Sequence, residues 1–304
     1  MKLALGTVQF GLDYGISNQS GQVNSTEVEA ILQQAHDAGI TLLDSASVYG
    51  NSEQVLGQLN ISQRFELVTK IPKLAHNTTS IMPHIEQSLR LLKRDQLDAV
   101  LFHHADDLIS HTKRSVFYQE LAALKQQEVV SRIGVSLYQP EQWQLLKNQY
   151  QLDLLQVPVN VLDQRFVSSS LLTDYQKHTV KLHCRSAFLQ GLLLMPANQR
   201  PSYFQPYQDQ LARFDRLVKQ FHCLPLVMCL ALFHVLDTNI KANQNIDDNI
   251  IEQVVVGCCS SAQLHEIVRA NQIARTININ PQPLSELASD IQALINPSLW
   301  QLGN

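Results

Sequence analysis

Residues 65–102 read FELVTKIPKLAHNTTSIMPHIEQSLRLLKRDQLDAVLF, and this stretch contains the pattern that decides the fold. An apolar run, Phe65 to Lys70, precedes a segment from Ser80 to Leu92 whose apolar residues recur at helical spacing, and a second apolar run follows from Leu97 to Phe102. Short apolar runs are typical of buried strands, whereas recurrence every three to four residues indicates a helix with one buried face. The stretch therefore predicts one strand–helix–strand unit.

The same alternation continues in both directions along the chain. A helix is expected at Thr26 to Ala38, with Ser25 in the capping position and acidic residues in the first turn. The remaining strands are expected at Leu3 to Leu5, Thr41 to Asp44, Ser131 to Val135, Leu152 to Val157, Val180 to Cys184 and Gln253 to Val256. Eight strands that alternate with helices match an α/β fold of the (β/α)8 TIM-barrel type, and the GxGxxG motif of the doubly wound alternative is absent from the sequence. Since no shift in composition marks a boundary, we expect residues 1–304 to form a single domain.

Composition and charge exclude several classes of protein. Of the 304 residues, 45% are hydrophobic and 16% are charged, as in a globular protein, and the net charge of -4 lacks the basic excess of a nucleic-acid binder. The first 15 residues lack the apolar core of a signal peptide, and no apolar run approaches the length of about 18 residues that suggests a membrane span. We therefore expect a cytoplasmic protein with no nucleic-acid or membrane partner. Its oligomeric state stays open.

The five cysteines do not suggest a metal or disulfide site. They show no CxxC spacing and no paired histidines nearby, and their number is odd. We therefore expect no bound metal.

Four residues with acid–base or charged side chains stand at or just after the expected strand ends, where TIM barrels place their active sites. Asp44 and Lys70 end the second and third expected strands. Tyr49 follows Asp44 in the next loop, and His103 follows the fourth expected strand. A lysine in this crowded position needs a carboxylate, which Asp44 supplies, and its charge is expected to lower the pKa of Tyr49. Tyr49 would then act as general acid toward a carbonyl oxygen, which a neutral His103 orients. The neighbouring His104 is expected to face away, because side chains alternate along a strand.

The segments that carry these residues resemble the aldo-keto reductase family. They are LLDSASVYG from Leu42, LVTKI from Leu67 and LFHHAD from Leu101, and further similarity covers nearly the whole chain. The resemblance implies NADP(H)-dependent reduction of a small-molecule aldehyde or ketone, with NAD(H) as an open alternative. It also implies catalytic roles for Asp44, Tyr49, Lys70 and His103.

The same resemblance implies a set of cofactor-binding residues. Ser136 and Gln156 would hold the nicotinamide carboxamide, and Gly6, Thr7 and Asp44 would lie near its ribose. The loop after the seventh strand would hold the pyrophosphate, and the loop after the eighth would hold the adenosine. The residues implied there are Ser186, Phe188 and Gly191, followed by Gly257, Cys259, Gln263 and Glu266.

The sequence departs from the family pattern at several implied sites. Arg185, itself one of the implied cofactor-binding residues, stands where many members stack an aromatic ring on the nicotinamide, and Leu137 stands where an Asn or Arg is common. No Lys or Arg occurs between Val254 and Val268, so Arg200 is the candidate for binding a 2′-phosphate. The chain also reaches its first expected strand directly, without the hairpin that closes the bottom of the barrel in many members.

Two other functions are compatible with this pattern. One is a non-catalytic regulatory subunit that binds a nicotinamide nucleotide on the same fold. The other is a different barrel enzyme that forms a Schiff base on Lys70. The loops at residues 13–24 and 190–214, which would select the substrate, carry no pattern that identifies it.

Overall fold

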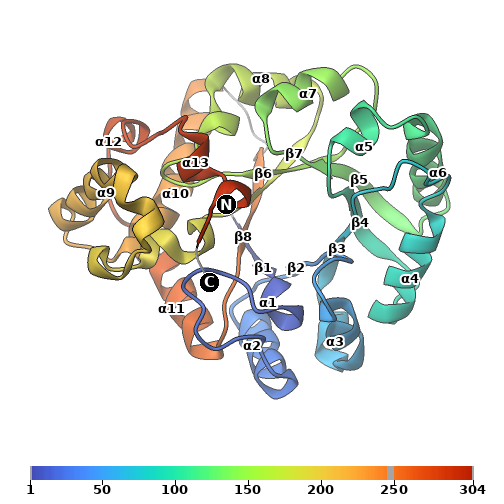
Figure 1. The fold of residues 1–304 in the computed structure, drawn as a ribbon, viewed down its shortest axis with the longest axis horizontal. Coiled ribbons are helices and arrows are strands. Elements are labelled where there is room, and N and C mark those ends of the chain that lie inside the picture. The colour runs from blue at the N-terminus through green and yellow to red at the C-terminus, as the bar shows by residue number, and fades with distance from the viewer. Residues whose placement is uncertain (1, 245–249, 303–304) are drawn as a thin grey trace.

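The computed structural model describes residues 2–244 and 250–302, which form a closed barrel of eight parallel strands surrounded by helices (Figure 1). The strands are β1 Lys2–Gly6, β2 Leu42–Asp44, β3 Glu66–Ile71, β4 Leu97–Phe102, β5 Val130–Ser136, β6 Leu154–Pro158, β7 Lys181–Arg185 and β8 Ile251–Val256. Each strand pairs with the next along the chain, and β8 closes on β1. The predicted (β/α)8 TIM barrel is confirmed.

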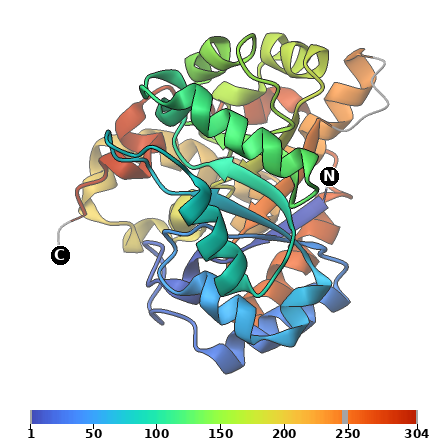
Figure 2. The same ribbon diagram turned by 90° about the vertical axis from the view of Figure 1, so that its right-hand side faces the viewer.

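Helices follow the strands and cover the outside of the barrel (Figure 2). The α-helices are α1 Val8–Gly11, α2 Ser25–Asp37, α3 Ser52–Gln58, α4 Met82–Leu92, α5 Asp106–Ile109, α6 Arg114–Gln126, α7 Pro140–Leu146, α8 Ser169–Lys177, α9 Gln208–Gln220, α10 Pro225–Gln244, α11 Ser261–Ala274, α12 Pro281–Ser285 and α13 Gln292–Ile295. Short 3-10 helices are η1 Asn60–Arg64, η2 Arg165–Val167, η3 Leu189–Leu194, η4 Ala197–Gln199, η5 Ser202–Tyr207 and η6 Pro297–Leu299.

The first of the predicted helices begins one residue earlier than its sequence signals suggested. Asn24, and not Ser25, is the N-cap of α2, and its side-chain oxygen accepts a hydrogen bond from the backbone N–H of Glu27 at 3.0 Å. Asn and Ser are both favoured N-cap residues and stand side by side here, so the sequence alone did not decide which of them caps the helix.

Two apolar layers follow from the alternation of side chains along the strands. Inward-facing residues fill the barrel itself, whereas their neighbours on the same strands pack under the surrounding helices. The inner layer is formed by Ala4, Leu42, Val68, Ala99, Leu101 and Leu154.

An arginine, a histidine and a glutamate lie together inside the barrel near the amino ends of the strands. Arg132 on β5 and His183 on β7 alternate with residues that pack outward, and both bind the carboxylate of Glu252 on β8, at 2.7 and 2.9 Å. The hydrogen bond from His183, followed by the one from Arg132, lowers the pKa of Glu252 to about 2.

The helix α10 corrects one expectation about membrane spans. Its window Pro225–Ala242 has a mean hydropathy of 1.2, so by length and composition alone this helix qualifies as a candidate span. His234 and Asp237 interrupt its apolar sequence. In the barrel, residues 227–233 of α10 are buried, and the helix packs against α11 and η3. The hydropathy of α10 is thus that of a core helix, because buried helices can be as long and as apolar as membrane spans.

Candidate active site

A cavity of about 800 Å³ lies at the carboxyl ends of the strands. The loops after β1, β2, β4, β5, β6, β7 and β8 line it, together with residues 295–298 near the C-terminus. Asp44, Tyr49 and His103 all reach this cavity, although they come from three different strand–loop junctions. Because the carboxyl ends of parallel strands converge, residues distant in sequence meet there.

Lys70 lies behind the cavity wall, bound to Asp44. Its ammonium donates to Asp44 Oδ2 at 2.8 Å and to the carbonyl oxygen of Ser45 at 2.7 Å, and its side chain is 0% exposed. Burial lowers the pKa of Lys70, while the Asp44 carboxylate acts in the opposite direction. The second oxygen of Asp44 accepts from Gln156 Nε2 at 2.7 Å. Both carboxylate oxygens are thereby held, which fixes the position of the ammonium.

The hydroxyl of Tyr49 is 3.5 Å from Lys70 Nζ and lies in the cavity. Burial raises the pKa of Tyr49, and the nearby Asp44 carboxylate raises it further. The expected lowering of this pKa is therefore not obtained, because burial and the Asp44 carboxylate both act in the opposite direction. Tyr49 is thus protonated at neutral pH, as a proton donor must be.

Close contact between two backbone segments places the Tyr49 loop. Gly11, at the end of α1, lies so near this loop that an added Cβ would stand 1.8 Å from the carbonyl oxygen of Tyr49. That carbonyl also accepts the N–H of Ser52 at 3.0 Å, where α3 begins. No side chain larger than a hydrogen atom fits at Gly11 without displacing Tyr49.

His103 faces Tyr49 across the cavity, with ring centroids 6.1 Å apart and the rings edge to face. Burial, followed by the charge of Lys70, lowers the pKa of His103 to about 3, so the imidazole is neutral. Its Nδ1 is buried and has no partner among the described residues. His104 does not line the cavity and stacks instead on Tyr138 at 5.6 Å.

The structure brings most of the implied cofactor residues to the same cavity. Those that line it are Gly6, Thr7, Asp44, Gln156, Arg185, Ser186, Phe188, Gly191, Gly257, Cys259, Gln263 and Glu266. The hydroxyl of Thr7 is already bound, since it donates to the carbonyl oxygen of Asp44 at 3.1 Å. Ser136 lies beside Gln156 in the sheet but is buried behind the cavity surface, and its Oγ has no partner among the described residues.

Arg200 is not brought to the cavity. Its guanidinium forms two hydrogen bonds with the carboxylate of Asp215 on α9, at 2.8 and 2.6 Å, and its side chain is 8% exposed. The arginine therefore joins the turn between η4 and η5 to α9. Its implied role at a 2′-phosphate has no support in this geometry.

The start of α11 is occupied by side chains of the protein itself. The carboxylate of Glu27 accepts the backbone N–H of Ser261 at 2.6 Å, and Ser260 Oγ accepts that of Gln263 at 3.2 Å. The N–H of Cys259 donates to Gln263 Oε1 at 2.7 Å. Together with Glu266 in the cavity wall, Glu27 makes this end of the site acidic.

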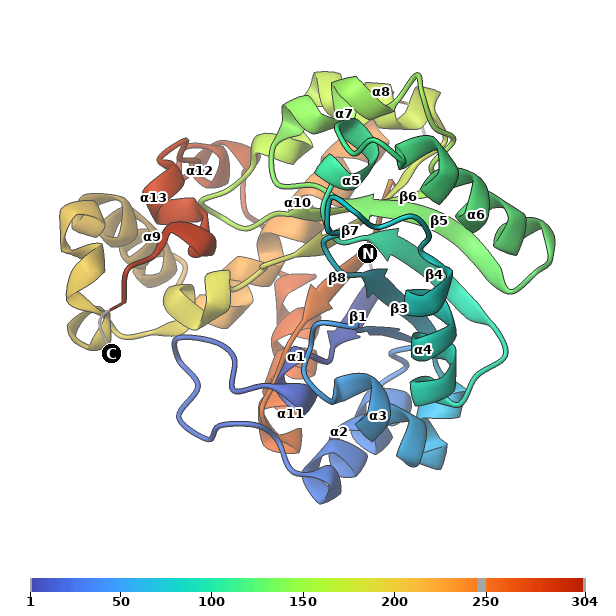
Figure 3. The same ribbon diagram turned by 45° about the vertical axis from the view of Figure 1, so that its right-hand side comes forward.

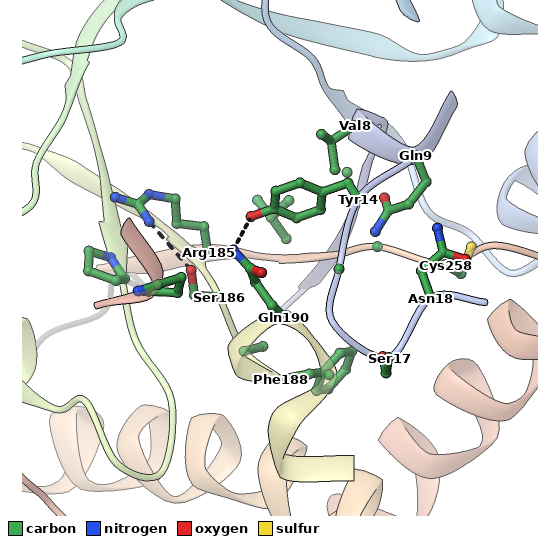
Figure 4. A pocket seen from close by; sticks show the side chains of 18 of the residues that line it. Val8, Gln9, Tyr14, Ser17, Asn18, Arg185, Ser186, Phe188, Gln190 and Cys258 are labelled. Atoms are coloured by element: carbon green, nitrogen blue, oxygen red, sulfur yellow. Dashed lines mark hydrogen bonds between the residues drawn. The ribbon is translucent and has the colours of Figure 1, made fainter. Parts of the chain in front are cut away.

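Sequence reasoning missed the contact between two loops above the cavity. The long loop between α1 and α2 reaches η3, as Figure 3 shows, and the backbone N–H of Ile16 donates to the carbonyl oxygen of Gln190 at 3.1 Å. Gln190 Nε2 also donates to the hydroxyl of Tyr14 at 3.2 Å (Figure 4). Neither loop carries a pattern that predicts this pairing.

Tyr138 was also missed, although it determines the position of Arg185. The guanidinium carbon of Arg185 lies 4.6 Å from the centre of the Tyr138 ring, within the range of a cation–π contact. Arg185 also donates to the carbonyl oxygen of Leu137 at 3.2 Å and to Ser186 Oγ at 3.4 Å. A tyrosine two residues after a strand gave no signal of this contact.

Comparison with known proteins identifies the family that this chain resembles over most of its length. A model of the aldo/keto reductase family matches residues 2–282. Oxidoreductase YdhF of Escherichia coli K12 is 26% identical over 211 residues, which cover 62% of this chain and 68% of that protein. The NAD/NADP-dependent indole-3-acetaldehyde reductase of Schizosaccharomyces pombe is 35% identical over 88 residues, which cover 28% of this chain and 30% of that protein.

A solved structure shows the same fold. The aldo-keto reductase AKR11C1 from Bacillus halodurans, in its holo form, matches with a TM-score of 0.68 over 98% of this chain and 94% of its own. The two sequences are 20% identical, so this likeness concerns the fold alone.

Proposed function

Because the chain belongs to the aldo/keto reductase family of oxidoreductases, we propose that it reduces an aldehyde or ketone to the alcohol, with Tyr49 as the proton donor. The observation that supports this best is the meeting of Tyr49, the Lys70–Asp44 pair and a neutral His103 at one end of the cavity. A single charged or acid–base residue at a strand end is common. Four that converge on one point are typical of an active site.

The cavity also suits the cofactor that the family implies. A reduced nicotinamide dinucleotide supplies a hydride from its C4 to the carbonyl carbon when it is bound. Ser136 Oγ and the cavity-lining Gln9 Oε1 are buried polar atoms with no partner among the described residues. An unsatisfied buried polar atom costs about 1–3 kcal/mol, so a ligand with polar groups is favoured at this place. Gln156 in the cavity wall, with Ser136 beside it just behind the surface, would hold the nicotinamide end, and the loops after β7 and β8 would hold the rest.

The protein's own residues then have distinct tasks. Tyr49 donates the proton from its hydroxyl to the oxygen of the substrate, and Lys70, 3.5 Å away, stabilises the phenolate that is left. Asp44 balances the charge of Lys70 and holds it in place. The neutral imidazole of His103 orients the carbonyl by hydrogen bonding to the same oxygen.

The geometry weighs against a Schiff base on Lys70. A lysine that attacks a carbonyl must reach the substrate, but the side chain of Lys70 is 0% exposed and does not line the cavity. Its ammonium is also held by Asp44 and by the carbonyl oxygen of Ser45. Lys70 therefore acts on the substrate through Tyr49.

We propose NAD(H) as the preferred cofactor, in place of the NADP(H) that the resemblance implied. The described residues that line the cavity include two cations, Arg165 and Arg185. Arg165 is paired with Asp163, and Arg185 lies at the Tyr49 end. The α11 end carries Glu27 and Glu266, which would repel a 2′-phosphate.

Fluorescence titration with NADH and NADPH tests this preference. We expect NADH to bind about ten-fold more tightly, and Arg200→Ala to leave the ratio of the two dissociation constants unchanged. Tighter binding of NADPH in the unaltered protein would show that a phosphate site exists after all.

The reduction itself is tested by following the absorbance of NADH and NADPH with sugar, aliphatic and aromatic carbonyls. We expect oxidation of the cofactor that depends on the carbonyl. Tight cofactor binding without turnover of any carbonyl would instead support the regulatory, non-catalytic alternative.

A further inference from the structure

The cavity contains one cationic side chain that no carboxylate neutralises among the described residues. Arg185 ends β7 and lines the cavity, and none of its hydrogen bonds is to an acid. The other charges nearby are paired: Asp44 with Lys70, and Asp163 with Arg165. Because His103 is neutral, Arg185 leaves this end of the cavity with a net positive charge.

Arg185 is close to the reacting groups. Its guanidinium lies against Tyr138, whose ring stacks on His104, and His104 is 5.3 Å from His103. Its charge also lowers the pKa of His103 and opposes the rise in the pKa of Tyr49. Arg185, Tyr49 and His103 line the same cavity, so a molecule bound at Arg185 would lie in the part of the cavity that also holds Tyr49 and His103.

The guanidinium is held in a fixed orientation. One face contacts the Tyr138 ring, and hydrogen bonds to Leu137 and Ser186 use two of its five N–H groups. Figure 4 shows Arg185 near Tyr14 and Gln190, two further residues of the cavity wall. A planar guanidinium with free N–H groups and no counter-charge matches the geometry of a carboxylate or a phosphate.

We propose that Arg185 binds the anionic group of the substrate, so that the enzyme selects carbonyl compounds that carry a carboxylate or a phosphate. This inference rests on the proposed carbonyl reduction. Arg185 is then a specificity-determining residue, and Tyr138 positions it.

Matched pairs of aldehydes test the proposal and separate the two kinds of anion. The first pair is 4-carboxybenzaldehyde and methyl 4-formylbenzoate, and the second is 4-formylphenyl phosphate and 4-methoxybenzaldehyde. We expect Arg185→Met to lower the anionic-to-neutral ratio of kcat/KM by about 10- to 100-fold in at least one pair. Comparing this ratio between the variant and the unaltered protein cancels any effect of the substitution on cofactor binding. It also cancels any difference in intrinsic reactivity between the two aldehydes of a pair.

Two further variants serve as controls. Lys177→Met removes the same charge from an exposed position on α8 and should keep the ratio of the unaltered protein. Tyr138→Ala keeps the charge but removes the surface on which it rests, and should give an intermediate ratio. An unchanged ratio in Arg185→Met for both pairs, with the neutral aldehydes still reduced, would overturn the role of Arg185.

A binding measurement separates this inference from the proposed reduction. Calorimetric titration with 4-(hydroxymethyl)benzoate and with 4-(hydroxymethyl)phenyl phosphate needs no turnover. Loss of binding in Arg185→Met, but not in Lys177→Met, would support the anion site even if no aldehyde is reduced. Equal affinities in both variants and in the unaltered protein would refute it.

Discussion

The hydroxyl of Tyr49 and the ammonium of Lys70 form the pair on which the proposed chemistry depends. Burial keeps the tyrosine protonated, whereas the ammonium at 3.5 Å favours the phenolate once the proton has left. The same residue can therefore hold its proton at rest and release it as negative charge develops on the substrate oxygen.

Replacing Tyr49 by Phe removes the proton donor while keeping the ring. We expect kcat to fall by about 100-fold or more and the dissociation constant of NADH to change by a few-fold at most. Steady-state kinetics and fluorescence titration measure the two quantities. Unchanged turnover in Tyr49→Phe would show that another group protonates the substrate.

The buried His103 makes the free energy of unfolding depend on pH. In the folded protein its pKa is about 3, against about 6.5 in an unfolded chain, so only the unfolded chain takes up a proton between these values. The free energy of unfolding should therefore decrease as pH falls from about 6.5 toward 3, by up to about 1.4 kcal/mol per pH unit from this residue.

Urea unfolding of His103→Asn at several pH values checks this contribution. The variant lacks the titrating group, so we expect its free energy of unfolding to fall less steeply with acid than that of the unaltered protein. Parallel slopes would mean that His103 is protonated in the folded state.

At the scale of elements, loops and short helices position the side chains that the strands only bring near. The loop of Tyr49 runs directly against the end of α1 at Gly11, and the loop of Tyr14 is bound to Gln190 in η3. The strand ends determine which residues reach the cavity. These contacts determine how each side chain is oriented.

Gly11→Ala tests the contact between α1 and the Tyr49 loop. The added Cβ would lie 1.8 Å from the carbonyl oxygen of Tyr49, so the loop must move. We expect at least a ten-fold loss of kcat, because a small misplacement of a catalytic group is costly. Ala262, the exposed second residue of α11, offers a control: Ala262→Ser should leave kcat unchanged. Full activity of Gly11→Ala would show that the loop relaxes without cost.

At the scale of the whole molecule, the two ends of the barrel have different tasks. The carboxyl ends of the strands form the cavity, whereas the amino ends are joined by Arg132, His183 and Glu252. In TIM barrels this second end contributes to stability. The two ends should therefore respond differently to substitution.

Glu252→Gln separates the two tasks. The variant leaves Arg132 without its counter-charge, and we expect the free energy of unfolding to fall by about 1–3 kcal/mol while kcat/KM is unchanged. Chemical denaturation and steady-state kinetics provide the measurements. Glu29→Gln, an exposed change on α2, should alter neither quantity. A loss of activity in Glu252→Gln without a loss of stability would contradict this division.

The sequence by itself determined the barrel and the residues at its active end. Strand and helix periods repeat from Leu3 to Val256, and a parallel barrel brings every strand end to one face, so Asp44, Lys70 and His103 could be placed together without coordinates.

Only the tertiary structure decided how far each charge is withdrawn from water and which partner it has. It placed Lys70 behind the cavity wall, paired Arg200 with Asp215, and laid Arg185 on Tyr138. These outcomes depend on burial and on loop conformations, which bring together groups without a shared sequence period. For that reason the expected fall in the pKa of Tyr49 and the expected phosphate contact of Arg200 were not obtained. The uncompensated charge of Arg185 became visible only in the folded protein.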